Sequence, residues 1–256
     1  MKQDIRFKNQ VGETQVATIV TPERVSAPLP IVIMTHGFGS NRHSETNKRL
    51  IAALVPRGIA AFTLDLSGHG ESEGNIADQT LSKGKSEIAS AVEVVRGIDW
   101  VDKTRIALEG SSFSGNADLL YAATDSQIRA LALKSPVTNY PETRELQLGE
   151  KKIQEWRVRG YMEVSGGNLS KYAFYEDATR IDTYAAVRQI KAPILVVQGD
   201  QDATIPMKHV ERLREALDSR KDRLEIIKDA DHSFTHAEHF DKMISLIAEF
   251  LIAQLL

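Results

Sequence analysis

The chain of 256 residues contains no cysteine. Disulfide bonds, thiolate metal sites and a cysteine nucleophile are therefore excluded, and the composition is compatible with a reducing compartment. No apolar run approaches the roughly 18 to 20 residues of a membrane span. The first twenty residues also lack the apolar core of a signal peptide. We therefore expect a cytoplasmic protein that does not bind a membrane.

Positive charge is not in excess either. Lysine and arginine number 32 against 35 acidic residues, which gives a net charge of −3. The basic residues are scattered along the chain, so the sequence has no basic stripe of the kind that binds nucleic acid. We expect a small-molecule partner and no nucleic acid, and a homodimer stays open.

Short apolar runs alternate with helical patterns along the chain. After an opening hairpin that turns at Gly12, we expect strands at 31–35, 60–66, 105–110, 128–136, 193–200 and 223–229, with helices at 50–59, 86–101, 115–123, 208–218 and 238–254. Apolar strands separated by helices are typical of a parallel sheet covered on both faces. In such a sheet the reactive site forms at the C-terminal ends of the strands. A single domain over 1–256 is expected.

One segment, about 137–186, interrupts the alternation. It contains a charged helical stretch, 142–159, and then a small hairpin that turns at 165–168. Because it is longer than an ordinary connection, it predicts a small inserted cap. Aromatic residues in the segment either line a pocket or pack the cap onto the body: they are Trp156, Tyr161, Tyr172, Phe174 and Tyr175.

Ser112 is the candidate nucleophile. It lies two residues after Gly110, at the point where an apolar strand ends and a helix begins. A serine on such a sharp turn has strained backbone geometry that exposes its hydroxyl, and small residues are needed two positions before and after it. The usual glycine after the serine is replaced here by Ser114. Ser111 and Ser114 are alternatives, but neither has a glycine two residues before it.

A serine hydroxyl needs a base, and His232 is the candidate. It follows the last expected strand, in a loop from which it could reach the nucleophile, and the chain order of nucleophile, acid and histidine fits. Of the other histidines, His43 and His209 are expected to be solvated, whereas His36 and His69 precede glycines in loops. His36 is expected to shape its loop by hydrogen bonds.

Asp202 is the candidate for orienting the imidazole of His232. It lies on the loop after the strand at 193–200, further out than Asp200, which could instead brace the loop through its side chain. Histidines 232, 236 and 239 have helical spacing that could suggest zinc, but the carboxylate pattern of a helical zinc site is absent, so we expect no metal.

Two backbone amides are candidates for binding an oxyanion. Gly37 follows a buried strand and would let the backbone turn so that the N–H of Phe38 faces the site. The second donor would be the N–H of Phe113, directly after the nucleophile. Asp65 and His69 are expected to brace a loop beside the site rather than to react.

These motifs together resemble the α/β-hydrolase superfamily over essentially the whole chain. HGFGSNRHSE, DLSGHGESEG, GSSFSG, GDQDATIP and ADHSF occur in the expected order. The chain is most similar to small bacterial carboxylesterases of the cinnamoyl/feruloyl esterase kind and to hydrolases like monoacylglycerol lipase. The resemblance implies an α/β fold with a mostly parallel eight-stranded sheet, helices on both faces and a small cap. By similarity it maps Ser112, Asp202 and His232 onto the family triad.

The expected function is hydrolysis of carboxylic esters through an acyl-enzyme, with small acyl or hydroxycinnamoyl esters as substrates and no cofactor. A thioesterase, a lipase or a peptidase of the same fold remains an alternative, since fold similarity does not decide the chemistry. A further alternative is a non-catalytic relative that only binds a ligand.

Overall fold

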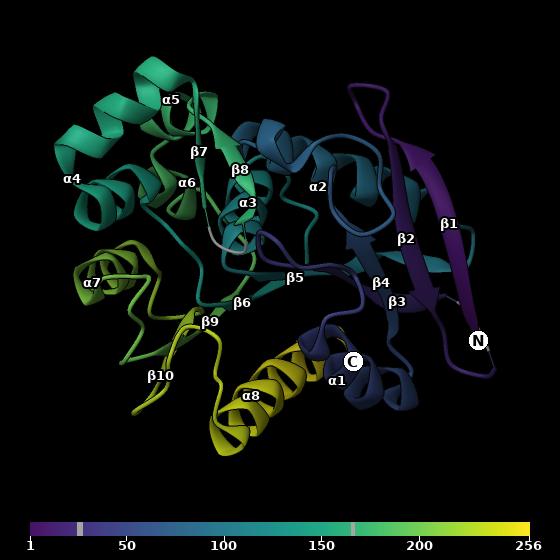
Figure 1. Ribbon diagram of the computed structural model, residues 1–256. Helices are drawn as coiled ribbons and strands as arrows, with labels where there is room; N and C mark the ends of the chain where they lie inside the picture. The colour runs from purple at the N-terminus through teal and green to yellow at the C-terminus, as the bar shows by residue number, and fades with distance from the viewer. Residues whose placement is uncertain (25–27, 165–166) are drawn as a thin grey trace.

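The computed structural model describes residues 1–24, 28–164 and 167–256. A central eight-stranded sheet has the order β1-β2-β4-β3-β5-β6-β9-β10, and β7 and β8 form a separate pair (Figure 1). The sheet is parallel from β4 to β10 and antiparallel where β2 meets β1 and β4. The strands are β1 Lys2–Lys8, β2 Thr14–Val20, β3 Leu29–Thr35, β4 Ala60–Asp65, β5 Val101–Ser111, β6 Ala130–Lys134, β7 Tyr161–Glu163, β8 Leu169–Lys171, β9 Ile194–Gly199 and β10 Arg223–Ile227.

Eight α-helices lie within the described residues. They are α1 Glu45–Leu54, α2 Leu81–Arg96, α3 Phe113–Ala122, α4 Tyr140–Arg159, α5 Ala173–Thr179, α6 Thr183–Val187, α7 Met207–Ala216 and α8 Ala237–Leu255. Short 3₁₀ turns are η1 Val55–Arg57 and η2 Ile76–Asp78. Helix α2 begins five residues before the predicted start, because the hydroxyl of Thr80 caps it by accepting the Lys83 N–H at 3.0 Å.

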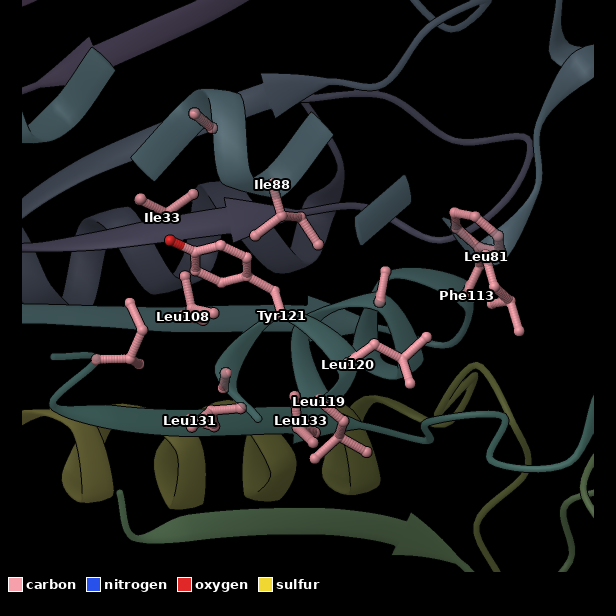
Figure 2. Close-up of a cluster of buried hydrophobic side chains, with 14 of the residues drawn as sticks. Ile33, Leu81, Ile88, Leu108, Phe113, Leu119, Leu120, Tyr121, Leu131 and Leu133 are labelled. Carbon is pink, nitrogen blue, oxygen red and sulfur yellow. The ribbon is translucent and has the colours of Figure 1, made fainter. Parts of the chain in front are cut away.

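Both faces of the sheet are buried, as continuous apolar strands require. In β3, Ile31 and Ile33 join the cluster that α2 and α3 cover, whereas Val32 and Met34 join the cluster under α1 and α8. Figure 1 shows α8 and α1 on one side of the sheet and α2 and α3 on the other. Figure 2 shows Leu108 and the side chains around it packed between the strands and α3. Among the described segments, none of the helices has the length and apolar content needed to cross a bilayer.

The segment between β6 and β9 contains α4, the β7–β8 pair, α5 and α6. The two short strands pair antiparallel, as a hairpin requires. Ser165 and Gly166, at the predicted turn, lie outside the described residues. The Trp156 side chain is buried and its indole N–H donates to the carbonyl of Ser170 at 3.0 Å.

The aromatic residues of this segment pack against one another rather than lining the cavity in front of Ser112. The Trp156 ring lies 5.6 Å from that of Tyr172 and 5.9 Å from that of Tyr175. Phe174 is buried in the main core, and Tyr161 is 40% exposed. None of these five predicted residues is among the described residues that line the cavity. Four of them therefore serve packing, whereas the exposed Tyr161 contacts Arg159.

Gly199 ends β9 where no side chain fits. A Cβ atom there would lie 2.2 Å from the carbonyl oxygen of Ala230 and 2.9 Å from that of Asp231. These two carbonyls belong to the loop that carries His232 over the sheet edge. A glycine at the end of β9 therefore lets this loop approach the strand closely.

We expect the Gly199→Ala substitution to push the loop away and to lower the free energy of unfolding by about 1–3 kcal/mol. The measurement is urea unfolding. Gly97→Ala is the control, because Gly97 has φ −75° and its nearest neighbour lies 3.3 Å from the added Cβ. An equal unfolding midpoint in the two variants would contradict the steric argument.

Candidate active site

The predicted site residues meet at the C-terminal edge of the parallel strands. Ser112 follows β5, Phe38 lies just after β3, Asp202 follows β9 and His232 follows β10. In Figure 1 the ends of β5, β6 and β9 lie below the cap segment formed by α4 and α5. The sheet therefore gathers residues from four distant parts of the chain.

Ser112 has the strained backbone predicted for it, with φ 53° and ψ −105°. Its N–H donates to the carbonyl of Lys134 at 2.8 Å, and its carbonyl accepts the N–H of Val137 at 3.2 Å. Gly110 is needed beneath the turn, because a Cβ atom there would lie 2.1 Å from an oxygen of Asp118. Burial raises the pKa of the Asp118 carboxyl, which packs against the turn, well above its ordinary value.

Three side chains form one hydrogen-bonded chain. The Oγ of Ser112 lies 3.0 Å from Nε2 of His232, and Nδ1 of His232 lies 2.7 Å from Oδ2 of Asp202. With Asp202 ionised, Nδ1 must carry the proton and donate it to the carboxylate, which leaves Nε2 free to accept the hydroxyl proton of Ser112. The arrangement can therefore activate the serine.

The carboxylate of Asp202 is fully buried and saturated with donors. Besides His232 it accepts the side-chain amide of Gln198 at 2.7 Å and the backbone N–H groups of Thr204 and Ile205 at 2.8 and 2.9 Å. Burial alone would raise the pKa of Asp202, but the imidazole of His232 and these donors lower it below its ordinary value. Asp202 is thus held ionised.

Asp200 braces the loop through its side chain, the role that the sequence analysis gave as its alternative. Its Oδ1 accepts the N–H of Asp229 at 2.7 Å. Asp229 has φ 60° and begins the turn that leads to His232. Asp200 therefore positions the loop, while Asp202 contacts the imidazole.

The two candidate oxyanion donors come from different segments, Phe38 from the loop after β3 and Phe113 from the start of α3. The rings of Phe38 and Phe113 are in edge contact, with centroids 6.2 Å apart. Their backbone N–H groups have no acceptor among the residues that the structure describes. The chain turns over residues 37–40, where the N–H of Ser40 donates to the carbonyl of Gly37 at 3.1 Å and Gly39 takes the left-handed conformation with φ 78°. Gly37 packs against Ser112, whose Cβ would lie 3.4 Å from an added methyl group.

Two neutral histidines brace the loop that carries Phe38. Burial lowers the pKa of His36 to about 4, and burial also lowers the pKa of His69. Nε2 of His36 accepts the N–H of Leu66 at 3.2 Å, and Nε2 of His69 accepts the N–H of Gly39 at 3.0 Å. Both rings act as acceptors only because they are uncharged.

Asp65 braces the segment that follows the Phe38 loop, which contains Arg42. Its carboxylate accepts the N–H groups of Arg42 and Glu71 at 2.6 and 3.0 Å and forms a buried ion pair with the Arg42 guanidinium. Asp65 and His69 therefore support the loop as expected, without contacting Ser112.

Ser114, which replaces the usual glycine, has a specific contact. Its side chain is fully buried and its hydroxyl donates to the carbonyl of His36. The substitution therefore links the helix after the nucleophile to the loop that carries Phe38.

The remaining histidines are partly as predicted. His43 is exposed. His209 was predicted to be solvated, which is wrong: its side chain is fully buried and its Nε2 lies 2.8 Å from a carboxylate oxygen of Glu142. The rings of His236 and His239 lie 5.5 Å apart. The described part of the chain contains no group of three or more histidine, aspartate or glutamate side chains arranged to hold a metal ion.

A cavity of about 530 Å³ opens in front of Ser112 and His232. Two residues of α4 that line this cavity, Tyr140 and Arg144, were not predicted from the sequence. Burial raises the pKa of the Tyr140 phenol, which therefore remains a hydrogen-bond donor at the cavity that Ser112 also lines. No local signal marks either residue, because only the folding of α4 over the sheet edge brings them to the cavity.

Comparison with known proteins agrees with this geometry. The model of the prolyl oligopeptidase family matches residues 45–256, the part of the chain that contains Ser112, Asp202 and His232. The chain belongs to the prolyl oligopeptidase family.

Relatives of this prolyl oligopeptidase family member are distant in sequence. Est1E from Butyrivibrio proteoclasticus, solved with ferulic acid bound, superimposes with a TM-score of 0.86 at 24% identity over 98% of each chain. The likeness shows the α/β-hydrolase fold that the motifs predicted. The quorum-quenching protein AidA of Acinetobacter baumannii is 24% identical over 87% of this chain and 86% of its own. A putative carboxymethylenebutenolidase of Yersinia pestis is 26% identical over 87% of this chain and 75% of its own.

The two aspartates of the β9 loop offer a matched test. Asp202→Asn should reduce kcat by about 10⁴-fold, because an amide favours the wrong imidazole tautomer and does not stabilise the imidazolium. Asp200→Asn keeps an acceptor oxygen for the Asp229 N–H and should stay within about tenfold of the wild type. The measurement is steady-state ester hydrolysis. Equal losses in both variants would remove Asp202 from its role.

Proposed function

We propose that this protein is a serine hydrolase that cleaves carboxylic esters through an acyl-enzyme. The observation that carries the proposal is the unbroken hydrogen-bonded chain from Ser112 through His232 to Asp202, with spacings of 3.0 and 2.7 Å. Its reactive end opens into the 530 Å³ cavity. Nucleophile and base within hydrogen-bond reach, with the base oriented by a third group, are the arrangement that acyl transfer requires.

In the first half of the reaction, Ser112 attacks the ester carbonyl while Nε2 of His232 accepts its proton. Asp202 stabilises the imidazolium that forms. The oxyanion of the tetrahedral intermediate accepts the N–H groups of Phe38 and Phe113, which lack other acceptors in the described chain. When the intermediate collapses, His232 donates its proton to the leaving alcohol and the acyl group remains on Ser112.

In the second half, a water molecule replaces the alcohol. His232 accepts a proton from this water, which attacks the acyl carbon, and then returns the proton to Oγ of Ser112. The carboxylic acid leaves and the serine is regenerated. These steps use only groups of the protein and water.

The substrates that we propose are small acyl or hydroxycinnamoyl esters. A cavity of about 530 Å³ is within the size range of small-molecule sites, roughly 300–1,000 Å³. The names of two relatives point the same way, since Est1E was solved with ferulic acid and the Yersinia pestis protein is a putative carboxymethylenebutenolidase.

Family membership favours one second candidate, a peptidase. An amide differs from an ester at the leaving group, because an amine must be protonated to leave, whereas an alkoxide leaves more readily. A panel of 4-nitrophenyl esters with short, long and hydroxycinnamoyl acyl groups, run beside aminoacyl 4-nitroanilides, separates the two functions. Turnover of the anilides by the wild type supports the peptidase, because a peptidase also cleaves activated esters, whereas ester turnover without anilide turnover supports the esterase. Thioesters in the same panel test a thioesterase.

For the setting we propose a cytoplasmic enzyme that acts on a small-molecule ester, contacting neither nucleic acid nor membrane. The absence of cysteine and the lack of a basic stripe support this setting. A homodimer is compatible with it.

Ser112→Ala should reduce 4-nitrophenyl ester turnover on the order of 10⁴-fold or more, because the variant has no nucleophile. It should also abolish labelling by a fluorophosphonate probe, which reacts with activated serines. Ser111→Ala is the matched variant and should still be labelled. A wild type that the probe does not label would instead favour a non-catalytic, ligand-binding protein.

A further inference from the structure

The cavity in front of Ser112 is lined by two cationic side chains, Lys134 and Arg144. No aspartate or glutamate is among the described residues that line it. Whether the cavity is electropositive toward a substrate therefore depends on whether acidic groups of the protein neutralise each of these two cations.

The charge of Lys134 is already opposed from within the protein. Glu109, Asp202 and Asp231 all interact electrostatically with its ammonium group. The same group lies 5.7 Å from the centre of the Phe234 ring. Lys134 therefore belongs to the electrostatics of the triad and its loop.

Arg144 has no such partner. Its guanidinium forms no ion pair with any residue of the described ranges, and its one hydrogen bond runs from Nη1 to the neutral side chain of Gln147 at 3.0 Å. The Nε–H of Arg144 has no acceptor among the described residues. The side chain as a whole is half-exposed and lines the cavity, so its other guanidinium donors can meet an acceptor from outside the chain.

The acidic neighbours of Arg144 on α4 are used elsewhere. Glu142 binds Lys208, His209 and Arg212 of α7. Glu145 accepts the hydroxyl of Tyr175 at 2.6 Å. Neither carboxylate forms an ion pair with Arg144 among the described residues.

We propose that Arg144 binds a carboxylate on the substrate, so that the preferred esters of this enzyme carry a negative charge in addition to the ester group. This inference rests on the proposed ester hydrolysis and narrows it. A guanidinium offers two parallel N–H donors that match the two oxygens of a carboxylate. One uncompensated positive charge matches the single charge of a carboxylate better than the nearly double charge of a phosphate.

The position of Arg144 also suits the binding of a substrate whose ester reaches Ser112. Tyr140 and Arg144 lie four residues apart on the same face of α4, and both line the cavity together with Ser112. A carboxylate on Arg144 would therefore be held on the cap side of the cavity, one tyrosine away from the reacting carbonyl. This arrangement links charge recognition to positioning of the ester.

Turnover of matched esters tests the proposal. One pair places the charge on the leaving group, 4-acetoxybenzoate against methyl 4-acetoxybenzoate. The other places it on the acyl group, mono-4-nitrophenyl adipate against its methyl ester. We expect kcat/KM of the wild type to favour the charged member of at least one pair by about tenfold or more, mainly through KM, with the preference falling as salt is added.

The same ratio is then measured in variants of α4. Arg144→Gln should abolish the preference, Arg144→Lys should keep part of it, and Arg144→Glu should reverse it. The matched control is Arg157→Gln, because Arg157 is an exposed arginine on α4, beyond the kink at Gly149, that does not line the cavity. An unchanged ratio in Arg144→Gln, or a wild type without preference in either pair, overturns the proposal.

A binding measurement separates this proposal from the proposed function. In the Ser112→Ala background, calorimetry should show the charged ester of the preferred pair binding at least about tenfold more tightly than its methyl ester, and adding Arg144→Gln should remove the difference. Equal binding of both esters overturns the carboxylate site even if esters are hydrolysed. A clear difference in binding without any ester turnover by the wild type supports the site and refutes the hydrolase.

Discussion

Ser112 occupies a backbone conformation that L-residues avoid, and the rest of the site depends on its being held there. A residue with φ 53° and ψ −105° costs of the order of 1–3 kcal/mol. The carbonyl of Lys134 holds the Ser112 N–H, and the N–H of Val137 holds its carbonyl. Gly110 lets α3 pack closely against the end of β5, where a Cβ atom would collide with Asp118. The strain is thus balanced by the packing of α3, β6 and the end of β5, whose side chains are almost all buried.

The loop that carries Phe38 is fixed to the same turn by polar contacts. Ser114 donates to the carbonyl of His36, and the neutral ring of His69 accepts the N–H of Gly39. Because the rings of His36 and His69 accept hydrogen bonds only while uncharged, burial of these two histidines serves the geometry of the loop. Nucleophile and candidate oxyanion donors therefore form one braced unit, to which the loops of Asp202 and His232 are added from the neighbouring strands.

The sequence predicted this site well because each of its residues follows a strand. Parallel strands end at one edge, so Ser112, Asp202 and His232 could be expected to meet without knowledge of the contacts. The burial of His209 could not be foreseen, because its partner Glu142 precedes it by 67 residues and belongs to the inserted segment. Arg144 was missed for the same reason: the way α4 lies over the cavity is decided by long-range packing. The earlier start of α2 did have a local signal, the capping hydroxyl of Thr80.

The most direct test of the account is a crystal structure of the enzyme after reaction with a phosphonate ester that mimics the tetrahedral intermediate. The account predicts a covalent bond from phosphorus to Oγ of Ser112. It also predicts a phosphonyl oxygen about 3 Å from the backbone nitrogens of both Phe38 and Phe113. An adduct on another residue, or an oxygen turned away from both amides, would contradict it.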